Sequence, residues 1–183
     1  MTKMVEVSIP KQLQDDFFYA DERKLSIDAE MYQEWEINAL NDGGYEALFF
    51  NSIDGFHPWK HSEVVIPAIM QSWKEKQSIL ADLYARRAVK EAAPYMKEGI
   101  KYTLATLYYA NEHPIVLNDW QNKVNQLPNV PVNFTERMTF ILSRPSLYQS
   151  FKALEQIMIE LEKLYARITI KKQNLLRKKT SQS

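Results

Sequence analysis

The chain has 183 residues, with 23 lysines and arginines against 23 aspartates and glutamates, 45% hydrophobic residues and no cysteine. This length and apolar content suit one folded domain with a sizeable core, and they argue against a disordered chain. The lack of cysteine excludes a disulfide framework and thiolate chemistry. No apolar run reaches the roughly 18 residues that a bilayer span needs, and residues 1–10 lack the features of a signal peptide, so a cytoplasmic location is expected.

The net charge of zero conceals an uneven distribution of charge along the chain. Residues 1–60 carry five basic and 12 acidic side chains, whereas residues 163–183 carry seven basic side chains and no acidic one. A basic end of this kind is typical of a solvated helix terminus, and equally of a segment that binds nucleic acid or another polyanion. The sequence leaves both interpretations open.

Residues 1–26 give the weakest structural pattern. A few apolar residues alternate with polar ones as in a short strand, but Pro10 ends this run. The aromatic patch at residues 17–19 is flanked by acidic residues and is expected to fold back onto the core, with a docking site for a partner as the alternative.

The first clear helix is expected over residues 28–41, with Ser26 or Asp28 as its cap. Met31, Trp35 and Ala39 would lie on one face of this helix, four residues apart. Gly43 would end it, because glycine readily takes the left-handed geometry of a helix cap. Residues 45–52 then predict a short buried helix, with a strand as the alternative.

The centre of the fold is expected at residues 98–111. Ile100, Leu104 and Leu107 recur at helical spacing, and further apolar residues extend this cover nearly all round the helix. A helix with apolar residues on all sides is normally enclosed by other elements. We therefore expect this helix to be the hub of the domain.

Another long helix is expected before the hub, from Ser62 to about Ala92. Pro67 is tolerable there only near the first turn. Pro94 would either open the central helix or kink one continuous rod.

The C-terminal half predicts three further helices. Asn118 can cap a short one, and Asn133 with Glu136 three residues later resembles the capping box of the next, which Pro145 ends. From Leu147 onward, apolar residues step by four and three in a heptad pattern, which indicates one long helix. Within a single domain such a seam packs on sister helices, and a homodimer seam is the alternative.

These elements predict an all-α fold, a single helical domain of about six helices that is bundle-like or orthogonally packed. The helical domain is expected to span residues 27–170. Residues 1–26 would form an N-terminal segment whose structure the sequence determines poorly, and residues 171–183 a basic, frayed C-terminal tail.

No catalytic or cofactor motif stands out. Glycine-rich phosphate loops and nucleophile elbows are absent, and no glutamate precedes a histidine by three residues as in di-metal bundles. His57 and His61, with Glu63 nearby, have a spacing that can hold zinc on a helix, but Pro58 lies between them and a third ligand is missing. We therefore expect no metal and no cofactor. The sequence favours a chain that is not an enzyme, and the alternative is an enzyme with an unfamiliar site in a deep pocket lined by His57, His61 or Glu63.

Basic side chains are the remaining candidates for binding. Arg86, Arg87 and Lys90, continued by Lys97 and Lys101 beside an exposed Tyr102, would form a strip for a phosphate backbone, or would pair with acids on their own helices. Arg137 and Arg144, seven residues apart, would share a helix face and either fix the corner at Pro145 or bind an anion. The candidate binding residues are Arg86, Arg87, Lys90, Arg137, Arg144, Lys171, Lys172, Arg177, Lys178 and Lys179.

A resemblance to a known family covers about a third of the chain. The matching residues are Glu136-Arg137, Phe140-Ile141-Leu142, Arg144-Pro145, Tyr148, Ser150-Phe151, Leu154 and Glu160-Leu161-Glu162-Lys163, together with Phe56-His57-Pro58-Trp59. This pattern resembles the YpoC-like family of small cytoplasmic proteins in Bacillus-type bacteria. The resemblance implies no activity, cofactor or catalytic residue, and so transfers no site.

The sequence thus favours a non-enzymatic protein-interaction or adaptor module, whose partner would be another protein or a second copy in a homodimer. The alternative is an accessory nucleic-acid (polyanion) binding protein that uses the basic strip and the C-terminal tail.

Overall fold

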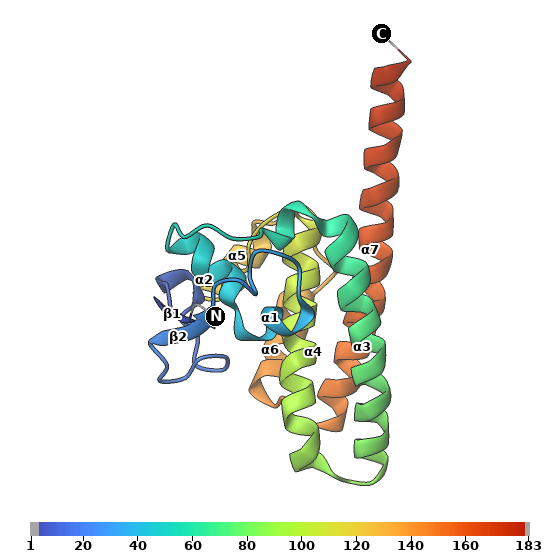
Figure 1. Ribbon diagram of the computed structural model, residues 1–183. Coiled ribbons are helices and arrows are strands. Elements are labelled where there is room, and N and C mark those ends of the chain that lie inside the picture. Colours follow the sequence, from blue (N-terminus) through green and yellow to red (C-terminus); the bar gives the residue numbers. More distant parts are fainter. Residues whose placement is uncertain (1–3, 182–183) are drawn as a thin grey trace.

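The structure is a computed structural model that describes residues 4–181 (Figure 1). Two short strands come first, β1 (Met4–Ser8) and β2 (Lys24–Asp28), which pair antiparallel with Val7 opposite Leu25. Seven α-helices follow within the described residues. They are α1 (Ile37–Asp42), α2 (Gly44–Phe50), α3 (Ser62–Ala85), α4 (Val89–Ala110), α5 (Trp120–Asn125), α6 (Phe134–Ser143) and α7 (Tyr148–Thr180). The prediction of a predominantly helical single domain is confirmed.

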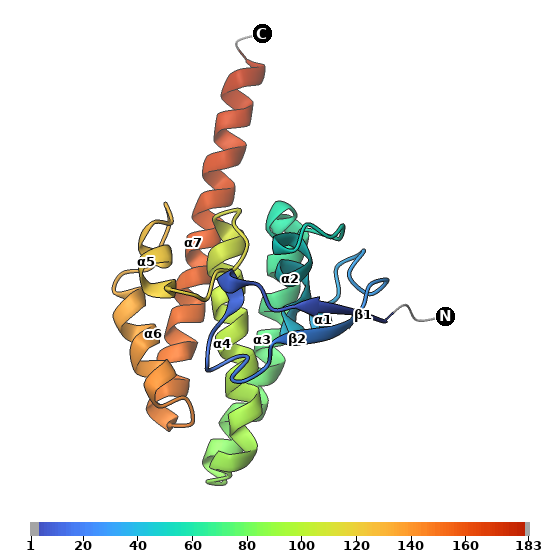
Figure 2. The ribbon, with the colours of Figure 1, turned by 90° about the vertical axis from the view of Figure 1, so that its left-hand side faces the viewer.

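Three long helices form the frame of the molecule. α3 and α4 run antiparallel, α7 packs against both, and α6 packs on α7 (Figures 1 and 2). The sheet lies with α1 and α2 at one side of this frame, where the buried Val7 and Ile27 tie the sheet to the core. The small sheet was not predicted with any weight, because each strand has only five residues and its partner lies far along the chain.

The prediction of a central helix is confirmed by α4. Each of its residues from 99 to 110 is buried, and Leu104 and Leu107 are 3% and 0% exposed. Gly99 allows this close packing, because a β-carbon there would lie 2.7 Å from Trp73 of α3 and 3.0 Å from Leu154 of α7. The three long helices therefore pack closely at Gly99, which has no side chain to separate them.

The predicted helix over residues 28–41 is wrong in its first two thirds. Asp28 closes β2 and accepts a hydrogen bond from the backbone N–H of Glu30, which makes it a turn residue and not a helix cap. The hydroxyl of Tyr45 then accepts from the backbone N–H of Glu36 at 2.7 Å, which ties down the chain ahead of the helix. Only Ile37–Asp42 is helical, and Gly43 ends it in the left-handed region at φ 71°, as expected.

The boundary between the two long helices also differs from the prediction. α3 ends at Ala85, and Arg87 takes a left-handed φ of 60°, while Ala88 N–H bonds back to Leu83. This arrangement is a Schellman-type helix end. Pro94 lies inside α4 and neither opens it nor joins it to α3. Asn133 does precede α6, but its side chain makes no capping hydrogen bond.

Candidate functional site

The C-terminal part of α7 projects beyond the rest of the molecule. We call residues 171–181 the arm, because the helix continues through them to Thr180 beyond the folded body (Figures 1 and 2). Each residue of the arm is exposed, including Leu175 at 52% and Leu176 at 64%. The arm has no acidic residue, and its basic residues are Lys171, Lys172, Arg177, Lys178 and Lys179. It is therefore a positively charged helix that carries two unburied leucines.

The earlier part of α7 anchors the arm to the body. Its heptad residues Phe151, Leu154 and Leu161 are buried within this chain, and the seam is half-buried at Tyr165 and Ile168. An ion pair between Lys172 and Glu112, just beyond α4, is the last contact with the body that we assign. The prediction that residues 171–183 fray concerns the stability of this segment and stays a prediction.

The arm and the other predicted basic group lie at opposite ends of the molecule. Arg86, Arg87 and Lys90 surround the turn from α3 to α4, at the foot of Figure 1, whereas the arm is at its top. Arg86 is paired with Asp82 on its own helix at 2.9 Å. The two groups therefore do not form one continuous basic surface.

The expected extension of that strip along α4 is wrong. Tyr102 is 2% exposed, and Lys101 is buried as well. Lys97 is exposed but donates to the backbone carbonyl of Phe18. The periodicity of α4 placed these residues on its outer face, but the N-terminal segment folds over that face and encloses it.

The two arginines near the α6–α7 corner have separate surroundings. Arg137 donates to Glu160 of α7 at 2.8 Å, so it links the two helices. Arg144 has an exposed side chain, while its backbone carbonyl accepts from Ser150 at 2.6 Å. These contacts are those of a structural corner.

His57 and His61 stack on different aromatic rings. His57 lies 5.0 Å from Trp59, and His61 lies 4.7 Å from Phe56. Burial lowers the pKa of the His57 imidazole below its ordinary value, with the Lys60 charge acting in the same direction. No group of three metal-ligating side chains occurs among residues 4–181.

An unpredicted pair of buried charges lies beneath the N-terminal segment. Glu46 of α2 accepts hydrogen bonds from the hydroxyl of Tyr109 at 2.6 Å and from the backbone N–H of Ile115 at 3.3 Å. Lys101 of α4 donates to the carbonyl of Asn41 at 2.5 Å. Burial raises the pKa of Glu46 and lowers that of Lys101 to about 8, and each charge partly opposes the shift of the other.

The space beside this pair is small. Glu46 and Lys101 line a cavity of about 10 Å³, which has room for about one water molecule. The rings of Phe18 and Tyr19 lie over the Lys101 ammonium at 5.1 and 5.3 Å. Perturbed pKa values are typical of functional sites, but they also occur in structural charge networks. With no room for a substrate, the pair is best explained as an internal polar contact between the N-terminal segment, α2 and α4.

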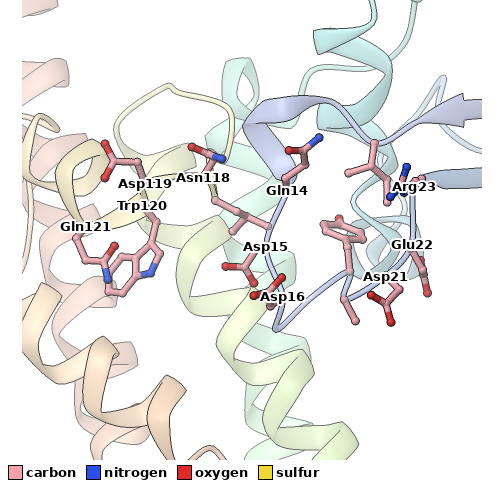
Figure 3. Close-up of a pocket in the computed structure, with 14 residues that line it drawn as sticks. Gln14, Asp15, Asp16, Asp21, Glu22, Arg23, Asn118, Asp119, Trp120 and Gln121 are labelled. Carbon is pink, nitrogen blue, oxygen red and sulfur yellow. The ribbon is translucent and has the colours of Figure 1, made fainter.

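A larger hollow lies on the outside of the same segment. It has a volume of about 790 Å³ and separates the N-terminal segment from the loop that leads into α5 (Figure 3). Backbone N–H groups of Leu117 and Asn118 donate to the carbonyl of Gln12, so the two walls are joined. We call this hollow the acidic groove, since it carries Asp15, Asp16, Asp21, Glu22 and Asp119 against a single basic residue, Arg23.

The acids of the groove are open to further contacts. None of the five forms an ion pair within residues 4–181. Asp15 accepts from the backbone N–H groups of Phe17 and Phe18, and Asp119 accepts from Asn122. The acids around residues 17–19 are neighbours in the sequence, but only the fold brings Asp119 to them.

Among the described residues, no helix combines the length and apolar character that a membrane span requires.

Comparisons with known proteins agree on one family. Residues 63–173 match the family model described as YpoC-like protein. A Bacillus subtilis (strain 168) protein that bears the name Uncharacterized protein YpoC is 28% identical over 116 residues, which cover 63% of this chain and 71% of that relative. No solved structure matches the chain. The family match runs from the first turn of α3 into the arm, through the central helix α4. The chain belongs to the YpoC-like family.

Proposed function

We propose that the protein is a non-enzymatic, cytoplasmic interaction module that binds its partner through the arm. The observation that supports this proposal is the free helix at the end of α7. Its residues 171–181 are all exposed, and they include two large apolar side chains among five basic ones.

A free helical segment of this kind has little to stabilise it alone. Helices shorter than about 12 to 15 residues are marginal in water, and most helical stability in proteins comes from packing of an apolar face. The arm is continuous with the anchored part of α7, which supplies its first turns, but Leu175 and Leu176 pack on nothing in the body to the extent that a core residue does. A partner that covers these leucines would supply the missing packing.

Site-specific crosslinking in cells tests the proposal. A photoreactive amino acid at Asn174 reports contacts of the arm, and the same amino acid at Lys90 reports contacts of the exposed opposite end. We expect Asn174 to give discrete protein adducts that Lys90 does not give. Identical adducts from both positions, or none from Asn174, would contradict the proposal.

A second candidate function is polyanion binding, which the charge of the arm favours. With five cations and no acid, the arm would neutralise nucleic-acid phosphates and release their counterions. The arm would act without Arg86, Arg87 and Lys90, which lie at the other end of the molecule.

This candidate is tested with a fluorescent oligonucleotide. Binding would weaken as salt rises, and the Lys171→Ala/Lys178→Ala variant would lower the slope of log affinity against log salt by about 2, because each lost phosphate contact contributes about 0.9. Absence of binding at low salt would rule this function out.

A further inference from the structure

We infer that the partner of the arm is a second copy of this chain, and that the arm of each copy lies along the acidic groove of the other. The inference rests on the proposed function, since it identifies the partner of the same helix. It follows from the division of charge, from the direction of the arm and from the residues of the groove.

The two surfaces have opposite net charge. From residue 163 onward the chain has seven basic side chains and no acidic one, so residues 1–162 hold 16 basic and 23 acidic side chains. The acidic groove concentrates five of those acids around one arginine. A chain whose total charge is zero is thus divided into a basic arm and an acidic body, and two copies satisfy both surfaces.

The same charge argues against pairing of two arms with each other. Each arm would bring five cations to the contact and no acid to balance them. Like charges in direct contact are destabilising. A surface that covers the leucines of the arm must therefore also carry acids for the surrounding cations, and the body of the chain has such a surface.

Direction excludes the groove of the same molecule. The arm continues the axis of α7 away from the body, on the right of Figure 1. The acidic groove lies on the N-terminal side, which faces the viewer in Figure 2, with the segment from Gln14 to Arg23 in front of α4. A straight helix cannot turn back across the body, so the arm reaches an acidic groove only on another molecule.

A two-fold axis would close this arrangement. If one body is turned by half a rotation in the plane of Figure 1 and set above the other, each arm runs down the N-terminal side of the partner. The arm is about 16 Å long at 1.5 Å per residue. The groove that it would enter has a volume of about 790 Å³. Both contacts are then identical, as in most homodimers.

The groove offers a small apolar area between its acids. Tyr19, Leu117 and Trp120 line it but are largely buried, with 6%, 5% and 8% of their surface exposed. Figure 3 shows Trp120 beside Asp119 on the wall opposite Asp15 and Asp16. Contact between the lysines of an incoming arm and the acids would therefore contribute most of the attraction, and Leu175 and Leu176 would contact the exposed edges of these apolar side chains.

Analytical ultracentrifugation of the full-length protein tests the inference. At about 0.05 M salt we expect a species of twice the 21.5 kDa chain mass. At about 1 M salt, where the screening length is about 3 Å, this species should dissociate. A monomer at low salt and high protein concentration would overturn the inference, and an oligonucleotide complex formed by that monomer would assign the arm to a polyanion.

Charge reversal locates the contact. Lys171→Glu/Lys178→Glu lowers the charge of the arm from +5 to +1. Asp16→Lys/Asp21→Lys changes two groove acids whose exposed side chains make no hydrogen bond in the described chain, and it raises the charge of the groove from −4 to 0. Each variant alone should dimerise more weakly than the wild type, because attraction is weakened at both of its contacts. An equimolar mixture should associate more tightly than either variant alone, because it restores one contact between an unchanged arm and an unchanged groove.

A matched control and the contrary outcome complete the test. Lys74→Glu/Lys90→Glu changes the net charge equally, at exposed positions on α3 and α4, and should leave the dimer intact. If the single variants dimerise as tightly as the wild type, or if the mixture associates no more tightly than the variants alone, the inference is wrong. Arm-specific crosslinks from Asn174 to another protein would then remain, so failure of this inference is distinguishable from failure of the proposed function.

Discussion

The middle of α4 and the end of α7 are helices of similar length in opposite surroundings. Residues 99–110 of α4 are all buried, and residues 171–181 at the end of α7 are all exposed. The first segment is held by contacts with α3 and α7, and the second by little more than its own backbone hydrogen bonds. The difference shows that packing stabilises the helix at residues 99–110, whereas the helix at the end of α7 lacks such packing within its own chain.

Truncation of one leucine in each segment should give the largest contrast. Leu107 is 0% exposed, and Leu107→Ala should lower the free energy of unfolding by about 2 to 5 kcal/mol through lost burial and a new cavity. Leu176 is 64% exposed, and Leu176→Ala should change the stability of the monomer by less than about 0.5 kcal/mol. Urea unfolding at high salt measures both, and equal losses would show that the arm packs on its own body.

The buried lysine should give the next largest effect, as a dependence on pH. The pKa of Lys101 is about 8 in the folded state against an ordinary 10.5, so the unfolded state binds more protons between these values. Stability from this group therefore rises as pH increases from 8, and it is lost as pH falls back through the folded pKa. Between pH 8 and pH 10 the contribution of this group to the free energy of unfolding should rise by about 2 kcal/mol.

Comparison with Lys101→Met isolates this contribution. The difference in unfolding free energy between the wild type and Lys101→Met should grow over that pH interval, since methionine fills a similar volume without a titrating group. The same pH slope in both proteins would mean that Lys101 is hydrated in the folded state.

Close packing around α4 predicts a smaller loss at Gly99. Alanine is the better helix former by about 1 kcal/mol, but its β-carbon would lie 2.7 Å from the Trp73 ring. Overpacking typically costs about 1 to 3 kcal/mol, so Gly99→Ala should be destabilising by about 1 kcal/mol net. An increase in thermal midpoint would show that Trp73 can move aside.

The contrast between these regions also explains what the sequence could predict. The apolar repeat of α4 is local, so periodicity alone placed Leu104 and Leu107 in the core. Lys101 sits within that repeat, and its buried environment depends on Glu46 and on the N-terminal segment, which are distant in sequence. A one-dimensional pattern holds no record of such contacts, and so it placed Lys101 at the surface.

Two further differences have equally specific causes. Aspartate is common both as a helix cap and in turns. Asp28 pairs with Met4 at the end of the sheet, and it therefore lies in the turn that follows β2. The acidic groove joins residues 14–23 to residues 117–121, and only the bonds to the Gln12 carbonyl show that these segments meet. The arm, in contrast, was visible as a run of cations without acids, because charge composition needs no tertiary contact to be read.

The smallest expected effect is in the local stability of the arm, measured by amide hydrogen exchange. In the monomer at high salt, amides of residues 173–180 should open with a free energy below about 1 kcal/mol, whereas those of residues 103–110 should approach the global unfolding value. At low salt and high protein concentration, covering of Leu175 and Leu176 by an acidic groove should slow exchange in the arm several-fold. The Lys171→Glu/Lys178→Glu variant should not show this change. Arm amides that exchange slowly at high salt as well would mean that the helix is stable without any partner, which would remove the main physical reason for assigning it a binding role.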